Sequence, residues 1–263
     1  LFTLLSAFCY SQNSTAYDEV KQKQSAIIYE YHKNCALKHN YKCEASQWQA
    51  CLDAGLAKDS TIAYLWQQKA MPLFKARKYE AGMIFLDKAV LYDEKEYLPY
   101  RAFIKCIFAK TYKDAIVDFE KCKLLFGNGY EMDHTYDFHI ALSYLQLNNF
   151  VKAEEIFKKD TEDQIKKFRS AHHLDLFYYG ISLFEQQKYD EAISIFNKAI
   201  FEVPNFADVK FYKALCLQQL GEKVVSNTLF LEAKMDLKNG NTINEDQIFY
   251  EMYPYQIRKL IEN

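Results

Sequence analysis

The chain has 263 residues, of which 50% are hydrophobic and 16% aromatic, so it can build a sizeable core and does not resemble a disordered chain. Its 33 Lys and Arg nearly balance its 35 Asp and Glu, and no run of like charge marks a nucleic-acid or polybasic membrane surface. Only 7 Gly and 4 Pro interrupt the sequence, too few turn signals for an all-β fold, and long helices are therefore expected.

Residues 1–11 have the pattern of the end of an export signal. Leu1 to Tyr10 are nearly all apolar, and Cys9 and Ser11 are small enough for a cleavage site before Gln12. An initiating Met and a charged beginning are missing, so we interpret the chain as starting inside the signal; an apolar tail is the alternative. No later segment approaches the roughly 20 unbroken apolar residues of a membrane span. We expect an exported protein, periplasmic or associated with the cell envelope, that is not inserted in a membrane in its mature form.

Residues 12–62 have helical periodicity in two stretches, 25–37 and 45–58, and we expect an N-terminal hairpin that serves as a degenerate repeat or cap. Cys35 and Cys51 lie where the two helices of that hairpin would face each other, so we expect a disulfide between them; two buried free thiols are the alternative. If Cys9 leaves with the signal, six cysteines remain, the even number expected in an oxidising compartment.

A three-residue pattern recurs along residues 63–240: a small residue, an aromatic residue or Leu four positions later, and a small residue three positions after that. The five occurrences are Gly82-Leu86-Ala89, Ala115-Phe119-Cys122, Ala153-Phe157-Asp160, Ala192-Phe196-Ala199 and Ser226-Phe230-Ala233. This spacing places the three residues on one stripe of a helix, where small side chains allow a second helix to approach closely. Asp160 departs from the pattern, and we expect its helix to end early or to pack loosely.

The pattern resembles the tetratricopeptide-repeat family, whose unit is about 34 residues long. The fullest match runs from 173 to 206 and carries Leu176, Tyr179, Gly180, Leu183 and Pro204 besides its triplet. The resemblance implies an all-α fold, a right-handed superhelix of stacked antiparallel helix pairs, in five units at about 63–96, 96–129, 134–167, 173–206 and 207–240. The repeat at about 96–129 matches at Ala102 only if one residue is inserted before Tyr112. Residues 241–263 break the pattern and are expected to form a C-terminal capping segment.

The resemblance also implies a non-catalytic scaffold that binds a protein or peptide segment on its concave face, which the first helix of each pair lines. Positions five, nine and twelve of the first helices are expected to face this groove, and apart from Gln67 at position five of the first repeat they are apolar. The groove residues we expect are Tyr100, Phe138, Leu142, Phe177, Ile181, Phe184, Phe211 and Leu215. The carboxylate clamp of Lys, Arg and Asn, with which well-known members bind chaperone tails, is not matched. Two alternatives remain: the groove is filled by the chain's own C-terminal segment in a structural or autoinhibited adaptor, or the aromatic rings are ordinary core.

No motif for catalysis or for a cofactor is present, since the sequence has neither a phosphate-binding loop nor a nucleophile elbow nor closely spaced cysteine pairs. Stacking of repeats could bring His134 and His173 near Asp137, which is a conceivable metal site. Residues in the first turn of a helix are usually solvated, however, and no HExxH arrangement exists. We therefore expect no enzyme activity, no cofactor and no metal.

Overall fold

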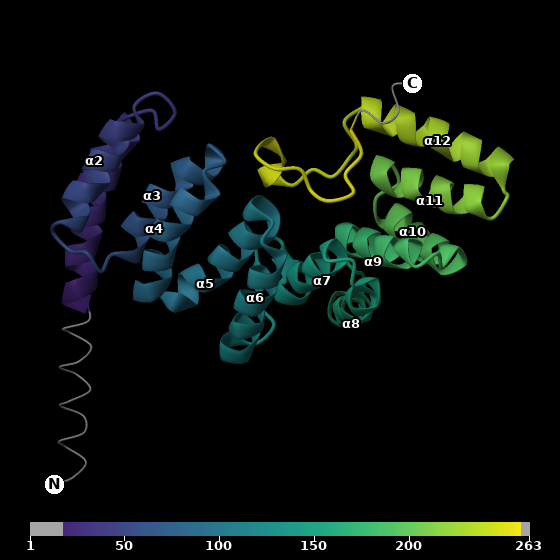
Figure 1. Cartoon of the computed structure of the whole chain (residues 1–263), viewed down its shortest axis with the longest axis horizontal. Coiled ribbons are helices and arrows are strands. Elements are labelled where there is room, and N and C mark those ends of the chain that lie inside the picture. The colour runs from purple at the N-terminus through teal and green to yellow at the C-terminus, as the bar shows by residue number, and fades with distance from the viewer. Residues whose placement is uncertain (1–17, 259–263) are drawn as a thin grey trace, which may run out of the picture. The chain divides into compact units, whose positions relative to one another are not determined.

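Helices follow one another along almost all of residues 18–258, the part of the chain that the computed structural model describes. They divide into two compact units, residues 1–98 and 99–263, and the boundary lies within helix α5 (Glu94–Phe103). Figure 1 shows helices throughout both units. The segment expected to be an export signal, residues 1–11, lies outside the described residues.

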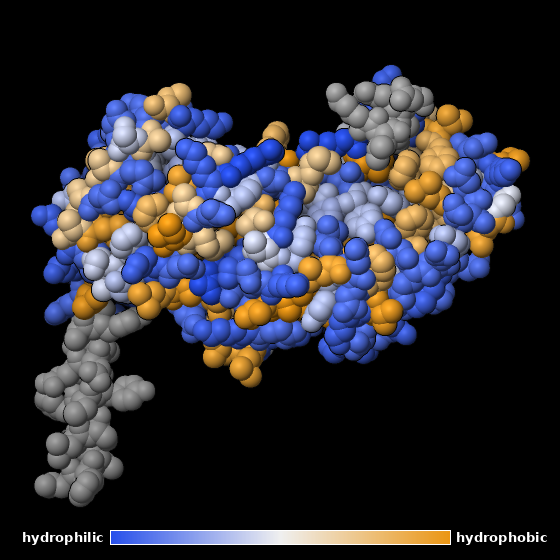
Figure 2. Space-filling model, in the orientation of Figure 1, coloured by the Kyte–Doolittle hydropathy of each residue, from blue (hydrophilic) through white to orange (hydrophobic). Residues whose placement is uncertain are grey.

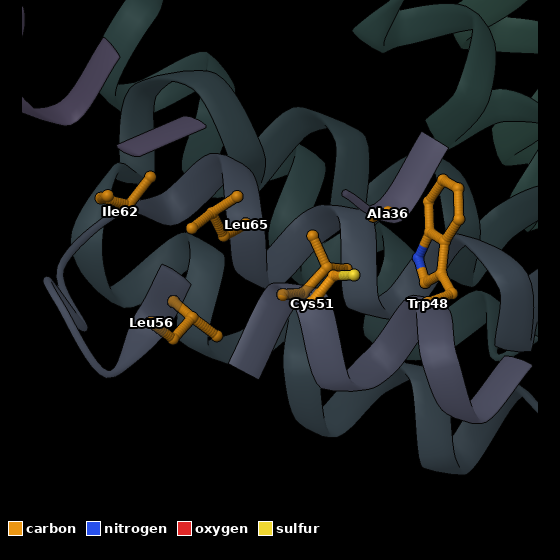
Figure 3. Packing of buried hydrophobic residues seen from close by; sticks show 7 residues of the cluster. Ala36, Trp48, Cys51, Leu56, Ile62 and Leu65 are labelled. Carbon is orange, nitrogen blue, oxygen red and sulfur yellow. The ribbon is translucent and has the colours of Figure 1, made fainter. Parts of the chain in front are cut away.

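The first unit begins with a helical segment, residues 18–28, that continues into a π-helical turn, η1 (Tyr29–Lys33), and a 3-10 helix, η2 (Ala36–Lys38). Helices α2 (Ala45–Leu56), α3 (Ala63–Lys75) and α4 (Tyr79–Tyr92) follow. Helix α2 packs on η1, η2 and α3, and α3 packs along α4. The buried side chains around α2, shown in Figure 3, form a cluster of Ala36, Trp48, Cys51, Leu52, Leu56, Ile62 and Leu65.

Cys35 and Cys51, the pair expected to bond, are joined by a disulfide in the structure, with their Cα atoms 5.7 Å apart. Cys51 belongs to the buried cluster and Cys35 packs against it. The bond therefore ties the segment that follows η1 to helix α2. Four further cysteines in the described residues are free thiols, of which Cys43 is exposed and the others are buried: Cys106, Cys122 and Cys216.

The second unit contains the remaining helices. After α5 come a π-helical segment, η3 (Ile104–Ala109), and then α6 (Tyr112–Phe126), α7 (Tyr136–Gln146), α8 (Phe150–Phe168), α9 (His173–Glu185), α10 (Tyr189–Glu202), α11 (Ala207–Gln219) and α12 (Lys223–Lys238). Helices α7 and α8, α9 and α10, and α11 and α12 pack as pairs, and each pair also packs on the next. The fold is thus an all-α solenoid of helix pairs, as the repeat pattern predicts.

The small residues of the repeat lie where one helix crosses another. A Cβ atom built at Gly180 would come within 2.3 Å of the ring of Phe196, the aromatic residue of the following helix. In the first unit, a Cβ atom at Gly82 would come within 2.4 Å of the ring of Phe74. At these two positions only a glycine allows the ring to lie directly against the neighbouring backbone.

Two irregularities of the repeat have structural explanations. The residue that the sequence requires as an insertion before Tyr112 is taken up by the π-helical segment η3, because a π-helix holds an extra residue in each turn. The expectation that the helix of Asp160 ends early or packs loosely is wrong. Helix α8 continues to Phe168, and the Asp160 side chain is buried, where it accepts a 2.9 Å hydrogen bond from the Thr135 hydroxyl.

A short hairpin precedes α7. Strands β1 (Tyr130–Glu131) and β2 (His134–Thr135) are antiparallel, with Tyr130 opposite Thr135 and Glu131 opposite His134. Among residues 18–258, no helix combines the length and the apolar composition that a membrane span requires.

Candidate functional site

The eight residues predicted to line an apolar groove fall into two groups. Four are fully buried: Phe138, Leu142, Phe177 and Ile181. The other four are partly exposed: Tyr100, Phe184, Phe211 and Leu215. Figure 2 shows apolar residues in separate patches among hydrophilic ones on the face that it presents.

The buried aromatic rings pack between neighbouring repeats. The centroid of the Phe177 ring lies 5.5 Å from that of Phe206 and 5.8 Å from that of Tyr212, which belongs to the next first helix, α11. Phe138 likewise lies 5.7 Å from Tyr178 on α9. These rings are core residues, the alternative that the sequence left open, and they do not form an open strip.

The C-terminal segment, residues 241–258, contacts α9 and α11, which are the first helices of their pairs. It therefore covers part of the side of the second unit that the first helices form, called the first-helix side below. In Figure 1 it leaves α12 as a yellow trace and runs back toward α6. The hydroxyl of Tyr178 donates a 2.8 Å hydrogen bond to the carbonyl oxygen of Pro254, and the hydroxyl of Tyr255 donates one of 2.8 Å to Glu185 Oε1. The Tyr253 side chain is buried. The segment therefore contacts first-helix residues that neighbour the predicted groove positions.

Asp208, at the beginning of α11, holds both ends of this segment. Its Oδ2 atom accepts hydrogen bonds from the Thr242 hydroxyl at 2.7 Å and from the backbone N–H of Ile243 at 3.0 Å, and its Oδ1 atom accepts one from the backbone N–H of Ile257 at 2.7 Å. Burial raises the pKa of the Asp208 carboxyl, although these hydrogen bonds oppose the shift. Near the middle of the segment, Glu251 forms an ion pair of 3.2 Å with Lys110.

The sequence analysis missed Asp208 and Tyr178, and no signal in the sequence alone identifies them. An Asp in the first turn of a helix is an ordinary stabilising residue because it interacts favourably with the helix dipole. Its role as an acceptor becomes visible only when the path of residues 241–258 is known.

A second group of polar residues, most of them buried, lies where the β1–β2 hairpin meets the start of α9. The Nδ1 atom of His134 lies 2.8 Å from Asp175 Oδ1, and the Nδ1 atom of His172 lies 3.5 Å from the same oxygen. On its other side, His134 Nε2 lies 3.7 Å from Glu245 Oε1, which belongs to the C-terminal segment. Gln164 Nε2 donates a hydrogen bond to Asp175 Oδ2.

The pKa values of His134, Asp175 and Glu245 depend on one another, because the three side chains lie close together. Burial lowers the pKa of His134, but the carboxylates of Asp175 and Glu245 outweigh burial and raise that pKa to about 9. Burial alone would raise the pKa of Asp175, and the nearby His134 holds it instead well below its usual range. The group is therefore an imidazole placed between two carboxylates in a low-dielectric environment.

The metal site considered from the sequence, His134 with His173 and Asp137, is not formed in the structure. Asp137 forms an ion pair of 2.5 Å with Lys123, and the ring of His173 packs on Phe206 with 5.3 Å between centroids. The adjacent residue, His172, comes together with His134 and Asp175 instead, and one potential ligand atom from each lies within 4.8 Å of the other two.

A sequence model of the tetratricopeptide repeat matches residues 176–205, which cover most of α9, the turn that follows it and all of α10. A search of curated proteins finds no match.

Solved structures share the fold, and two of the three that follow, the Parabacteroides merdae protein and YrrB, are described as tetratricopeptide-repeat proteins. One from Parabacteroides merdae is 17% identical with a TM-score of 0.59, and the match covers 88% of this chain and 81% of that chain. PilF of Pseudomonas aeruginosa is 14% identical with a TM-score of 0.58, covering 81% of this chain and 93% of that one. YrrB, described as a protein with an unusual peptide-binding site, is 17% identical with a TM-score of 0.51, covering 70% of this chain and 91% of that one. Identities this low establish the fold alone.

Proposed function

We propose that the chain, which matches a tetratricopeptide repeat at residues 176–205, is a non-catalytic scaffold that binds an extended protein or peptide segment on its first-helix side. We propose further that its own C-terminal segment occupies this side until a partner replaces it. This joins two expectations from the sequence, a partner-binding module and an autoinhibited adaptor, in one molecule. The hydrogen bonds of Tyr178 and Asp208 with residues 241–258 carry the proposal.

The chemistry of these contacts suits exchange with another chain. Tyr178 bonds the backbone carbonyl of Pro254, and Asp208 bonds the backbone N–H groups of Ile243 and Ile257. Main-chain bonds of this kind can be made by any extended segment that follows the same path, whereas the side-chain contacts select among segments. A segment in the same chain competes at a high effective concentration, so a partner has to bind more tightly or be multivalent to displace it.

The partly exposed residues of the predicted groove fit this role. Phe184 and Phe211 both pack against Tyr212, with ring centroids 5.6 Å and 5.4 Å away, and Tyr212 packs in turn against Tyr255 at 5.8 Å. A partner that displaced Tyr255 could pack against Phe184, Phe211 and Tyr212 in its place. The relative with a described peptide-binding site supports the same use of the fold.

Export to the periplasm or the cell envelope is part of the proposal. It rests on the apolar pattern of residues 1–11 and on the Cys35–Cys51 disulfide, because structural disulfides persist in oxidising compartments. PilW, described as a type IV pilus biogenesis factor, is another protein with this fold, 14% identical with a TM-score of 0.58.

The experiment measures binding of a fluorescent peptide with the sequence of residues 241–263 to two forms of the chain, one ending at residue 240 and one complete. Fluorescence anisotropy should detect binding to the shortened form and much weaker binding to the complete form. A complete chain with Asp208→Ala, which keeps the segment but loses its anchor, should bind the peptide to an intermediate degree. Equal binding to all three forms would exclude self-occupation, and no binding to any of them would exclude the site.

A further inference from the structure

Three side chains from separate elements place metal-binding atoms around one point in the second unit. His134 comes from strand β2, His172 is the residue before α9, and Asp175 lies in the first turn of α9. Asp175 Oδ1 lies 2.8 Å from His134 Nδ1 and 3.5 Å from His172 Nδ1, and one ligand atom of each residue lies within 4.8 Å of the others. Two imidazole nitrogens and a carboxylate oxygen are a donor set typical of zinc.

The surrounding contacts hold the side chains of Asp175 and His134 and the backbone of His172. Gln164 donates through Nε2 to Asp175 Oδ2, and its Oε1 atom accepts a 2.8 Å hydrogen bond from the backbone N–H of His172. The second nitrogen of His134, Nε2, faces the carboxylate of Glu245 at 3.7 Å. A histidine that ligates a metal through one nitrogen usually directs the other at a carboxylate or a carbonyl, which fixes its tautomer and raises its basicity.

The histidines have unsatisfied hydrogen-bonding capacity. The His134 side chain is 1% exposed and its Nε2 atom makes no hydrogen bond, and the same is true of the buried Nδ1 atom of His172. Buried polar atoms without a hydrogen bond are uncommon and call for an explanation. A cation bound to Nδ1 of both rings gives His172 Nδ1 a partner and favours the tautomer of His134 that carries its proton on Nε2, toward Glu245.

We propose that His134, His172 and Asp175 bind a divalent transition-metal ion through His134 Nδ1, His172 Nδ1 and Asp175 Oδ1, and that zinc is the best fit. Three protein ligands leave one tetrahedral position. A cavity of about 400 Å³ lies beside the site, and His172 and Asp175 line it together with Tyr130, Gln164 and Phe168. A water or a side chain of a partner can enter there.

The adjustment that the site requires is small. Zinc with bonds of about 2.0–2.1 Å to nitrogen and oxygen places its tetrahedral ligands roughly 3.3 Å apart, so the widest separation of 4.8 Å has to close by about 1.5 Å. His172 can make this movement, since its side chain is 36% exposed and it precedes the helix. His134 and Asp175 are buried and already near their places.

The test uses the complete chain purified without a histidine tag, in a Cys43→Ser background that removes the exposed thiol. The protein is freed of metal with a chelator, equilibrated with Zn²⁺ and dialysed, and bound zinc is measured by mass spectrometry. We expect about one ion per chain. Cobalt in place of zinc should give the intense visible absorption of a tetrahedral site.

Substitutions of single residues test whether the ion is bound by the three proposed ligands. His172→Ala and Asp175→Asn should each lower the retained zinc at least tenfold, and Glu245→Gln should weaken zinc affinity about tenfold or more while keeping one ion per chain. His173→Ala is the matched control, because His173 is the next residue and packs its ring on Phe206. Circular dichroism verifies that each variant is folded, and zinc should raise the melting temperature of the wild-type chain but not of His172→Ala.

Two results would overturn the proposal. One is a wild-type chain that retains no zinc after dialysis, which would make the group a hydrogen-bonded ion cluster only. The other is equal zinc retention by His172→Ala and His173→Ala, which would place the ion elsewhere. Neither result affects the peptide-exchange experiment, so failure of the metal site and failure of the scaffold function are distinguishable.

Discussion

The hydroxyl of Tyr178 donates a 2.8 Å hydrogen bond to the carbonyl oxygen of Pro254, which lies 76 residues further along the chain. The same tyrosine ring packs 5.7 Å from Phe138 on the preceding first helix. Tyr178 therefore contacts a neighbouring repeat with its ring and the C-terminal segment with its hydroxyl.

Tyr178→Phe should loosen the C-terminal segment without disturbing the repeats, because it removes the hydroxyl and keeps the ring. We expect a loss of about 0.5–1.5 kcal/mol in the free energy that holds the segment in place. Hydrogen exchange of residues 241–258 should become faster while exchange in α9 stays unchanged. Tyr179→Phe, at the partly exposed neighbouring position, is the control, and equal exchange in both variants would contradict the role of the bond.

Phe177→Ala should destabilise the second unit by about 3–5 kcal/mol, the usual cost of truncating a fully buried phenylalanine. Its ring fills the space between α9, Phe206 and Tyr212. Phe211→Ala, at the equivalent but partly exposed position of the last repeat, should cost clearly less. Urea denaturation measures both, and nearly unchanged stability of Phe177→Ala would restore the interpretation of Phe177 as a groove residue.

The Cys35–Cys51 bond should be present in protein isolated from the cell and should stabilise the first unit. Peptide mapping without reduction is expected to find the two cysteines in one cross-linked fragment. A bond between residues 16 apart contributes about 3 kcal/mol by restricting the unfolded chain. Cys35→Ser should lower the stability of this unit by a similar amount, whereas Cys43→Ser, at an exposed free thiol, should not. Recovery of both Cys35 and Cys51 as free thiols would refute the prediction.

The repeat was predictable from the sequence because its physical cause is local. Gly180 and Phe196 meet in one helix pair, and their spacing along the chain encodes that contact. The same holds for the insertion before Tyr112, which the sequence detects as a shift in register and the structure accommodates in η3.

The site was less predictable because it depends on contacts between repeats. Whether Phe177 faces a groove or the next first helix depends on how α9 packs on α11, and the contact of Phe177 with Tyr212 becomes visible only in the structure. The contact of His172, rather than His173, with Asp175 likewise becomes visible only in the structure. Residues 241–258 have no repeat, and no pattern in the sequence specifies their path to Asp208.

Asp208→Ala should release the C-terminal segment more completely than Tyr178→Phe. The carboxylate of Asp208 accepts three hydrogen bonds, and its removal leaves the backbone N–H groups of Ile243 and Ile257 without their acceptor. Each buried donor left without a partner costs about 1–3 kcal/mol, which is enough to favour the undocked segment.

Undocking should expose the buried side chains of Tyr253 and Ile257, so the variant is expected to bind a hydrophobic dye and to be cut faster by protease within residues 241–258. Asp190→Ala is the matched control, because Asp190 also lies in the first turn of a helix, α10, but is exposed there. It tests the loss of a favourable helix-dipole interaction alone. If both variants are cut at the same rate and bind the same amount of dye, Asp208 does not anchor the segment. If only Asp208→Ala changes, the carboxylate at the start of α11 controls access to the first-helix side of the scaffold.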